Sequence, residues 1–198
     1  APQVRAQGGV LGLAPHSLRA VPPDSLHAAL QGLDAIVPGA PVHIHIAEQL
    51  GEVQDCLAIL GARPVEWLLG ELEVDARWCL IHATQMTPGE TVALARSGAV
   101  AGLCPITESS LGDGIFDGVR WTGAGGAFGV GSDSNIRISL AEELRQLDTS
   151  QRLRDHSRAA LATVELSTGR RVFDGVARGG AQAAGRGTGA IEVGQPAD

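Results

Sequence analysis

The stretch from Val42 to Glu48, Val-His-Ile-His-Ile-Ala-Glu, brings two imidazoles and a carboxylate close together in the sequence. Its apolar and histidine side chains alternate with the two-residue period of a β-strand, so His43 and His45 face the same way. His45 stands at the carboxyl end of this predicted strand, where α/β proteins bind ligands, and Glu48 follows just beyond it. An imidazole beside a carboxylate suits hydrolytic metal chemistry, whereas a lone histidine on an apolar strand favours a core role.

Three other predicted strands end in residues that could share this chemistry. His82 closes the strand that starts at Trp78, Asp133 follows the strand that starts at Phe128, and His16 and Arg19 follow Val10 to Ala14. Because the carboxyl ends of parallel strands meet on one face of a barrel, we expect these side chains to converge. Nitrogen and carboxylate ligands from separate strands suit a zinc-type ion that activates water. The less favoured alternative is that each strand ends in a polar residue merely to meet solvent.

The order of the predicted elements indicates an α/β fold. Strands are expected at residues 10–14, from 42 to about 45, and at 78–82, 99–104 and 128–131. Helices are expected from about residue 24, at 49–60, 64–72, 88–96, 116–123, 140–147 and 150–162, and at 167–184 with an interruption at Gly179-Gly180. A polar, glycine-bearing loop is expected from Thr107 to Gly114. Five strands that alternate with helices predict a parallel sheet with βα crossovers.

Composition narrows the class of protein and its partners. With 198 residues, of which 44% are hydrophobic and 19% charged, the chain can bury the core of one domain. The formal net charge is -7 and the 15 basic residues, all arginine, form no basic stripe, which argues against nucleic acid as a partner. No apolar run approaches the roughly 20 residues of a spanning helix, and no signal peptide is visible, so we expect a cytoplasmic protein without membrane contact. A small molecule is the expected partner, and a homodimer is the one protein assembly that we keep open.

Cysteine usage gives no sign of a disulfide framework. Cys56, Cys79 and Cys104 are far apart and lie in apolar surroundings. They also lack the Cys-x-x-Cys spacing of a zinc site. We therefore predict three reduced thiols in the core.

Motifs along essentially the whole chain carry a family resemblance. The broad motifs are the His-x-x-Glu of residues 45–48 and the Ser-Asp-Ser of residues 132–134. The narrower ones are Leu13-Ala-Pro-His-Ser-Leu-Arg-Ala20, Leu111-Gly-Asp-Gly-Ile-Phe116, Glu142-Glu-Leu-Arg145, Gln151-Arg-Leu153 and Ser167-Thr-Gly-Arg170. The broad motifs resemble the amidohydrolase superfamily, and the narrower ones resemble its formimidoylglutamate deiminases, which act in bacterial histidine degradation.

The resemblance implies a fold, a reaction and a set of site residues. The fold would be an eight-stranded (β/α) barrel of the TIM type, and the reaction the hydrolysis of N-formimino-L-glutamate to N-formyl-L-glutamate and ammonia. One divalent metal would be bound, zinc by preference or iron. By resemblance the metal ligands are His45 and Asp133, the catalytic residues are Glu48, His82 and Asp133, and the substrate-binding residues are His16 and Arg19. A guanidinium pairs with a carboxylate through two hydrogen bonds, which agrees with a substrate that carries carboxylates.

Two features depart from the family pattern. Gln85 stands where the family usually has a second histidine, three residues after His82. The His-x-His pair of the first barrel strand is absent, and five strands cannot close a barrel of eight. We therefore predict that residues 1–188 correspond to about strands four to eight with the C-terminal helices, and that residues 189–198 begin a small flanking β-domain. The 198 residues alone are predicted to bind metal weakly and to aggregate, and the sequence leaves their activity open.

Several alternatives stay open at this point. Another amidohydrolase, such as a guanine, cytosine or triazine deaminase, would not need Arg19 near its ligand. A fragment that keeps the fold without catalysis is the alternative from a different class, whereas a phosphate-binding barrel lacks support because no glycine-rich loop follows the last strand. Glu108 and Asp113 fall in the predicted loop, where function and solubility are equally open. His43 lies deeper than His45 and is predicted to support the site rather than to bind metal.

Overall fold

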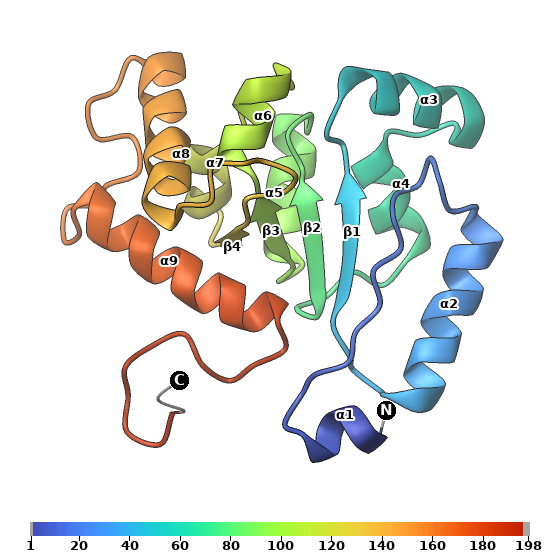
Figure 1. The fold of residues 1–198 in the computed structure, drawn as a ribbon. Coiled ribbons are helices and arrows are strands. Elements are labelled where there is room, and N and C mark those ends of the chain that lie inside the picture. Colours follow the sequence, from blue (N-terminus) through green and yellow to red (C-terminus); the bar gives the residue numbers. More distant parts are fainter. Residues whose placement is uncertain (1, 196–198) are drawn as a thin grey trace.

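The computed structural model describes residues 2–195, in which helices alternate with short strands (Figure 1). The strands are β1 (Val42–Ile46), β2 (Trp78–His82), β3 (Val100–Leu103) and β4 (Ala127–Val130). The helices are α1 (Pro2–Ala6), α2 (Pro23–Ile36), α3 (Leu50–Leu60), α4 (Pro64–Glu71), α5 (Pro88–Arg96), α6 (Pro105–Leu111), α7 (Gly118–Gly123), α8 (Leu140–Asp155) and α9 (Thr168–Ala183).

The four strands form one parallel sheet in the order β1-β2-β3-β4. Each strand pairs with the next one along the chain: Ile46 of β1 lies opposite His82 of β2, and Leu103 of β3 lies opposite Val130 of β4. Parallel neighbours need a crossover connection, which the intervening helices provide. The predicted parallel α/β sheet is therefore confirmed, and the carboxyl ends of all four strands lie along the same edge.

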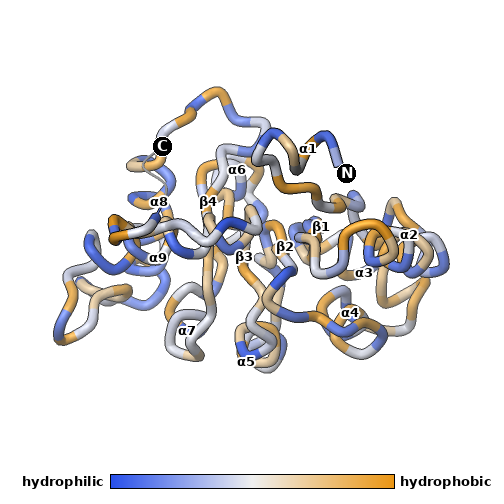
Figure 2. Tube along the Cα trace, turned by 90° about the horizontal axis from the view of Figure 1, so that it is seen from below, coloured by the Kyte–Doolittle hydropathy of each residue, from blue (hydrophilic) through white to orange (hydrophobic). Residues whose placement is uncertain are grey.

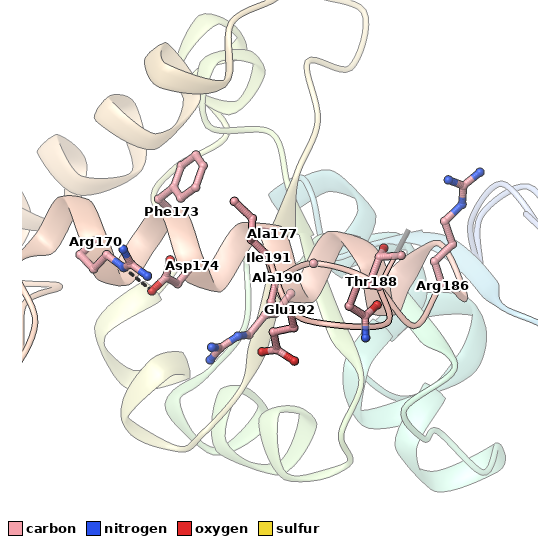
Figure 3. Close-up of a pocket in the computed structure, with 12 residues that line it drawn as sticks. Arg170, Phe173, Asp174, Ala177, Arg186, Thr188, Ala190, Ile191 and Glu192 are labelled. Atoms are coloured by element: carbon pink, nitrogen blue, oxygen red, sulfur yellow. Dashed lines mark hydrogen bonds and ion pairs between the residues drawn. The ribbon is translucent and has the colours of Figure 1, made fainter. Parts of the chain in front are cut away.

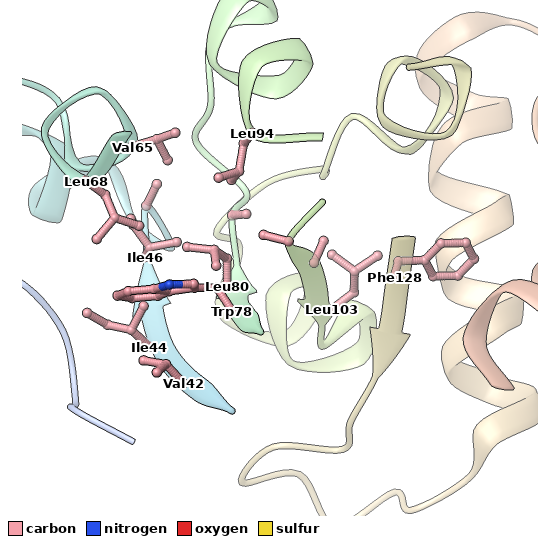
Figure 4. Close-up of a cluster of buried hydrophobic side chains, with 14 of the residues drawn as sticks. Val42, Ile44, Ile46, Val65, Leu68, Trp78, Leu80, Leu94, Leu103 and Phe128 are labelled. Carbon is pink, nitrogen blue, oxygen red and sulfur yellow. The ribbon is translucent and has the colours of Figure 1, made fainter. Parts of the chain in front are cut away.

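The alternating sequence of β1 separates the two faces of the sheet. Its apolar residues are at most 1% exposed: Val42, Ile44 and Ile46. They lie on the side where Figure 4 shows Leu68 of α4 and Leu94 of α5, and Figure 2 shows α4, α5 and α7 in a row beside the strands. Full burial of one aliphatic side chain contributes about 1.5–3 kcal/mol, so this face fixes the register of the strand. His43 and His45 are thereby left on the opposite face.

Residues 10–14 do not form the buried strand that the sequence predicts. They contribute an isolated parallel bridge to β1 through Leu13, and a second one follows at Ser17. Val10 is 45% exposed rather than buried. Pro15 explains the interruption, because it has no N–H to donate at the point where a continuous ladder would require one.

The segment from Thr107 to Gly114 is largely helical, which corrects the predicted loop. Pro105 occupies the first turn of α6, and Gly112 ends the helix in the left-handed conformation with φ 74°. These are ordinary signals for the start and end of a helix. The first turn is buried throughout, including the polar Glu108, so no apolar stripe marks the helix in the sequence.

The C-terminal helices also differ from their predicted bounds. The expected break before Ser150 does not occur, because α8 continues to Asp155. The Ser150 hydroxyl donates a hydrogen bond to the carbonyl of Leu147, so the residue is accommodated inside the helix. His156 ends α8 with φ 51°, and residues 156–162, which the sequence predicts as helical, lie beyond it.

Helix α9 runs without interruption through Gly179 and Gly180, contrary to the predicted break. A Cβ atom on Gly179 would lie 2.0 Å from the carbonyl oxygen of Phe128 in β4. A Cβ atom on Gly175, one turn earlier, would lie 2.7 Å from the ring of the same residue. The glycines therefore let the helix backbone rest directly on the strand, which is a packing role rather than a break.

This contact predicts opposite outcomes for two adjacent alanine substitutions. Gly179→Ala should lower the free energy of unfolding by about 3 kcal/mol, since neither backbone can move away without losing its packing. Gly180→Ala is the matched control, because a Cβ atom there meets nothing within 4 Å. It should be neutral or stabilise the protein by about 0.5–1 kcal/mol. Urea unfolding measures both changes, and equal effects would contradict the proposed packing.

The end of the described chain shows no strand. Residues 189–195 contain turns and irregular backbone, and residues 196–198 lie outside the described part. The flanking β-domain expected from residue 189 onward therefore stays a prediction.

The structure bears on two expectations from the sequence, the state of the cysteines and the presence of a membrane-spanning helix. Cys56, Cys79 and Cys104 are all buried and free, as predicted. Within residues 2–195, no helix combines the length and apolar character that crossing a membrane requires.

Candidate active site

The backbone turns sharply where the strands end, and it does so at residues with unusual dihedral angles. Ala47 after β1, His82 and Ala83 at the end of β2, and Asp133 after β4 have φ values of 49°, 70°, 50° and 49°. A residue other than glycine in this left-handed region costs on the order of 1–3 kcal/mol, and such residues cluster at functional sites. The strained positions mark the edge where the predicted site residues stand.

Three of the predicted residues bring their imidazole rings together. His45 and His82 are stacked, with 5.7 Å between ring centroids, and His16 lies 4.9 Å from His45 by the same measure. The Nδ1–H of His45 donates a hydrogen bond of 2.7 Å to the carbonyl of His16. This bond fixes the ring and leaves Nε2 as the nitrogen that can bind an ion.

Glu48 lies beside this group and is held there by Glu52 of α3. The Glu48 carboxylate comes within 3.7 Å of Nε2 of His82. Glu52 is 1% exposed, and its two oxygens accept hydrogen bonds from the backbone N–H groups of Ala47 and Glu48, at 2.9 and 2.8 Å. Burial raises the pKa of Glu48 above its ordinary value, which favours a carboxyl group that can hold and deliver a proton.

His82 is 2% exposed and lies between two carboxylates. Its Nδ1 is 3.4 Å from Glu108 of α6, on the side opposite Glu48. Burial by itself lowers the pKa of His82. The hydrogen bond to Glu108 and the charges of Glu48 and Asp133 outweigh that effect, so the pKa of His82 is raised overall.

Asp133 joins the group from the loop after β4. It is exposed, and its loop is tied to α6 where Thr107 donates a hydrogen bond of 3.3 Å to the carbonyl of Ser132. Its negative charge raises the pKa of both Glu48 and His82, which places its carboxylate within electrostatic reach of both. The structure thus brings His45, Glu48 and His82 together by direct contacts, and Asp133 follows β4 at the same edge of the sheet.

Arg19 is close to the site but not bound within it. Its exposed side chain forms no ion pair or hydrogen bond with any residue of the described range. Its charge lowers the pKa of Cys56 in α3, although burial raises that pKa overall to about 11. The guanidinium is thus available to an external anion at the rim beside α3.

Two supporting residues hold neighbouring elements in place. His43 donates a hydrogen bond of 2.8 Å from Nε2 to the carbonyl of Ala183, which joins β1 to the end of α9 and agrees with a supporting role. The backbone N–H of Gln85 donates to the carbonyl of Ala47 at 2.7 Å, and its side chain donates to the carbonyl of Asp113. Gln85 therefore links the loops that follow β1, β2 and α6.

The residues present fit part of a metal site. A ring nitrogen of His45 and the carboxylate of Asp133 are donors of the type that zinc prefers, and the second nitrogen of His45 is already hydrogen-bonded, as in metal-binding histidines. Among residues 2–195, no group of three or more histidines, cysteines and carboxylates has the geometry to hold an ion. A catalytic ion needs about three protein ligands, so these two residues supply part of such a set.

Of the two buried glutamates at this site, sequence reasoning misses Glu52 and leaves the role of Glu108 open. Glu52 stands four residues after Glu48, in the first turn of α3, and this spacing is the signal that could indicate it. For Glu108, the sequence does not decide between a functional role and a solvent-exposed one, because its segment resembles a polar loop. The structure shows both carboxylates buried against the groups that the sequence does identify.

A separate cavity of about 860 Å³ lies between α9 and residues 186–195 (Figure 3). Arg170, Phe173 and Arg178 are among the residues that line it, and Arg170 is paired with Asp174 at 2.6 Å. None of the predicted site residues lines this cavity. The groove is therefore separate from the group of side chains at the strand ends.

Comparison with known proteins gives consistent matches over the whole chain. A family model described as "Amidohydrolase family" matches residues 1–198. A formimidoylglutamate deiminase of Pseudomonas aeruginosa is 50% identical over 98% of this chain and 43% of its own length. A 5-methylthioadenosine/S-adenosylhomocysteine deaminase of Nitratidesulfovibrio vulgaris is 31% identical over 95% of this chain and 42% of its own length.

Solved structures agree with these matches. An amidohydrolase from Brucella melitensis superposes with a TM-score of 0.88 and 56% identity over 93% of this chain and 41% of its own. An adenosine deaminase from Xanthomonas campestris, solved with bound zinc, gives a TM-score of 0.83 and 28% identity over 94% of this chain and 42% of its own. The chain thus spans about two fifths of the length of each relative.

Proposed function

Because the chain belongs to the amidohydrolase family, we propose that it forms part of a metal-dependent hydrolase that converts N-formimino-L-glutamate to N-formyl-L-glutamate and ammonia. The observation that carries the choice of substrate is the 50% identity with a formimidoylglutamate deiminase across 98% of the chain. In this proposal the enzyme acts in the cytoplasm, as a step of histidine degradation.

The proposal assigns two residues to a divalent ion, zinc or iron. His45 would bind through Nε2 and Asp133 through its carboxylate, in agreement with the donor set described above. When bound, such an ion lowers the pKa of water and so supplies a nucleophile at neutral pH. Zinc in the Xanthomonas relative supports the choice of metal.

The remaining steps are assigned to side chains of this chain. Asp133 accepts a proton from the attacking water, and Nε2 of His82 orients that water against the formimino carbon. Glu48 holds a proton on its carboxyl group, which its raised pKa favours, and transfers it to the departing nitrogen. The same nitrogen then takes up the proton that Asp133 accepted, its bond to the formimino carbon breaks, and the proton of the remaining hydroxyl returns to Glu48, so that ammonia leaves and a formyl group stays on the nitrogen of glutamate.

Recognition of the substrate is assigned to His16 and Arg19. N-formimino-L-glutamate carries two carboxylates, and the exposed guanidinium of Arg19 can bind one of them through two parallel hydrogen bonds. His16, whose ring lies against His45, is assigned with Arg19 to binding the carboxylates of the substrate. A neutral nucleobase would leave the charge of Arg19 without a partner.

A substrate panel tests this proposal. The full gene product, loaded with zinc, is assayed for ammonia release from N-formimino-L-glutamate, guanine, cytosine and S-adenosylhomocysteine. We expect kcat/KM for the first compound to exceed the others by roughly 100-fold or more, because a site with fixed polar partners rejects a substrate that leaves them unpaired. A preference for S-adenosylhomocysteine or a nucleobase would instead favour the deaminase alternative.

Substitution of the two proposed ligands tests the metal assignment. His45→Ala and Asp133→Ala should each lose bound zinc together with activity, since a catalytic ion depends on about three protein ligands. Elemental analysis of the purified variants is the measurement. His43→Ala is the matched control, because His43 shares the face of His45 but is bonded to Ala183, and it should keep its zinc.

A further inference from the structure

Glu108 is a buried carboxylate that the proposed reaction does not yet use. It is 3% exposed, in the first turn of α6. One of its oxygens, Oε1, lies 3.0 Å from the backbone nitrogen of Cys104 and 3.4 Å from Nδ1 of His82. Burying a carboxylate is costly unless hydrogen bonds compensate, and here both contacts come from donors.

These contacts determine which ring nitrogen of His82 carries the proton. A neutral imidazole carries one N–H, and an oxygen that accepts from Nδ1 retains the proton on that nitrogen. The lone pair of Nε2 then faces the other side of the ring, where Glu48 lies 3.7 Å away. The backbone of His82 is strained, with φ 70°, as is common for residues at functional sites.

We propose that Glu108 is a positioning residue, which keeps His82 in the Nδ1–H tautomer and directs Nε2 toward the substrate. The inference rests on the proposed function only for the identity of that substrate. The arrangement follows the general logic of a carboxylate that orients a functional histidine from behind. Glu108 itself does not contact the reacting atoms.

A purely structural role for Glu108 would be to stabilise the start of α6. That helix already has an acceptor of this kind, because Glu143 of α8 accepts a hydrogen bond of 3.0 Å from the backbone N–H of Ile106. Glu143 is also buried, at 2% exposure, and within the described residues it forms no hydrogen bond or ion pair with His82. Glu143→Gln therefore perturbs the same helix without altering the partner of the histidine, which makes it the matched control.

The direct test is ¹⁵N NMR of the histidine rings in the zinc-loaded full gene product, at a pH where the imidazoles are neutral. In the wild type, His82 should carry its proton on Nδ1. Glu108→Met should shift His82 toward the Nε2–H tautomer, whereas Glu108→Gln, whose amide oxygen can still accept, and Glu143→Gln should keep the wild-type signal. His43, bonded through Nε2, and His45, bonded through Nδ1, serve as internal references.

Kinetics supply the second readout. Glu108→Met should lower kcat by about 10- to 100-fold with KM little changed, and Glu108→Gln should recover most of the loss. An unchanged tautomer of His82 in Glu108→Met, or an equal loss of kcat in Glu143→Gln, would overturn the inference. A failure of the proposed function can be told apart from a failure of this inference. If the enzyme does not act on N-formimino-L-glutamate, the NMR signals still give the tautomer of His82, and kcat can be measured on the substrate that the enzyme prefers.

Discussion

Replacing Glu48 with glutamine is expected to lower kcat by roughly 10²- to 10⁴-fold while zinc content and fold stay as in the wild type. The amide is nearly the same size as the carboxyl group and can keep the contact with His82, but it cannot transfer a proton to the leaving nitrogen. Steady-state assays with N-formimino-L-glutamate, combined with elemental analysis, measure both quantities.

The pH dependence of kcat identifies the role of this residue. Because the acid form of Glu48 would be the active one, kcat should fall as pH rises through its raised pKa, and this fall should be absent in Glu48→Gln. Glu71→Gln, an equal change of charge at the exposed end of α4, is the control and should behave as the wild type. A near-normal rate in Glu48→Gln would show that Glu48 is structural.

Replacing Arg19 with methionine is expected to weaken binding of the transition state by about 2–5 kcal/mol, a fall in kcat/KM of roughly 30- to 4000-fold. The substitution keeps much of the side-chain volume but removes the charged, two-pronged contact with a carboxylate. Zinc content should not change, because Arg19 is not among the proposed ligands. Initial-rate kinetics over a range of substrate concentrations give the effect.

Two comparisons make this result specific. Arg158→Met removes a similar exposed charge beyond the end of α8 and should leave kcat/KM within about twofold. An N-formimino compound without a side-chain carboxylate should react poorly with both wild type and Arg19→Met, and at similar rates if Arg19 binds that carboxylate. Undiminished turnover of N-formimino-L-glutamate in Arg19→Met would remove the carboxylate assignment.

The part of the site that could be predicted from the sequence is the part encoded locally. A two-residue period fixes which side chains of β1 share a face, so the pattern alone places His45 and Glu48 at a strand end. Convergence with His82 then follows from the geometry of parallel strands. Glu108 cannot be found this way, because its partner lies 26 residues away in the chain and its own helix is buried throughout its first turn.

The errors in the fold have the same physical origin. The flexibility of glycine predicts a helix break at Gly179, but the role of this residue depends on the backbone of Phe128, which is distant in the sequence. Pro15 shows the reverse case, since its missing N–H breaks the pairing of a stretch whose apolar residues predict a strand. Patterns report the preferences of single residues, whereas these outcomes depend on a partner element.

The contact between α9 and β4 has a consequence for the time course of synthesis. Gly131 donates its N–H to Leu103 of β3, and since strand residues alternate, the polar backbone groups of Phe128 point the other way, toward α9. The ribosome makes α9 after β4, so the close contact of Gly179 with the backbone of Phe128 can form only on the order of seconds after the strand itself has been made.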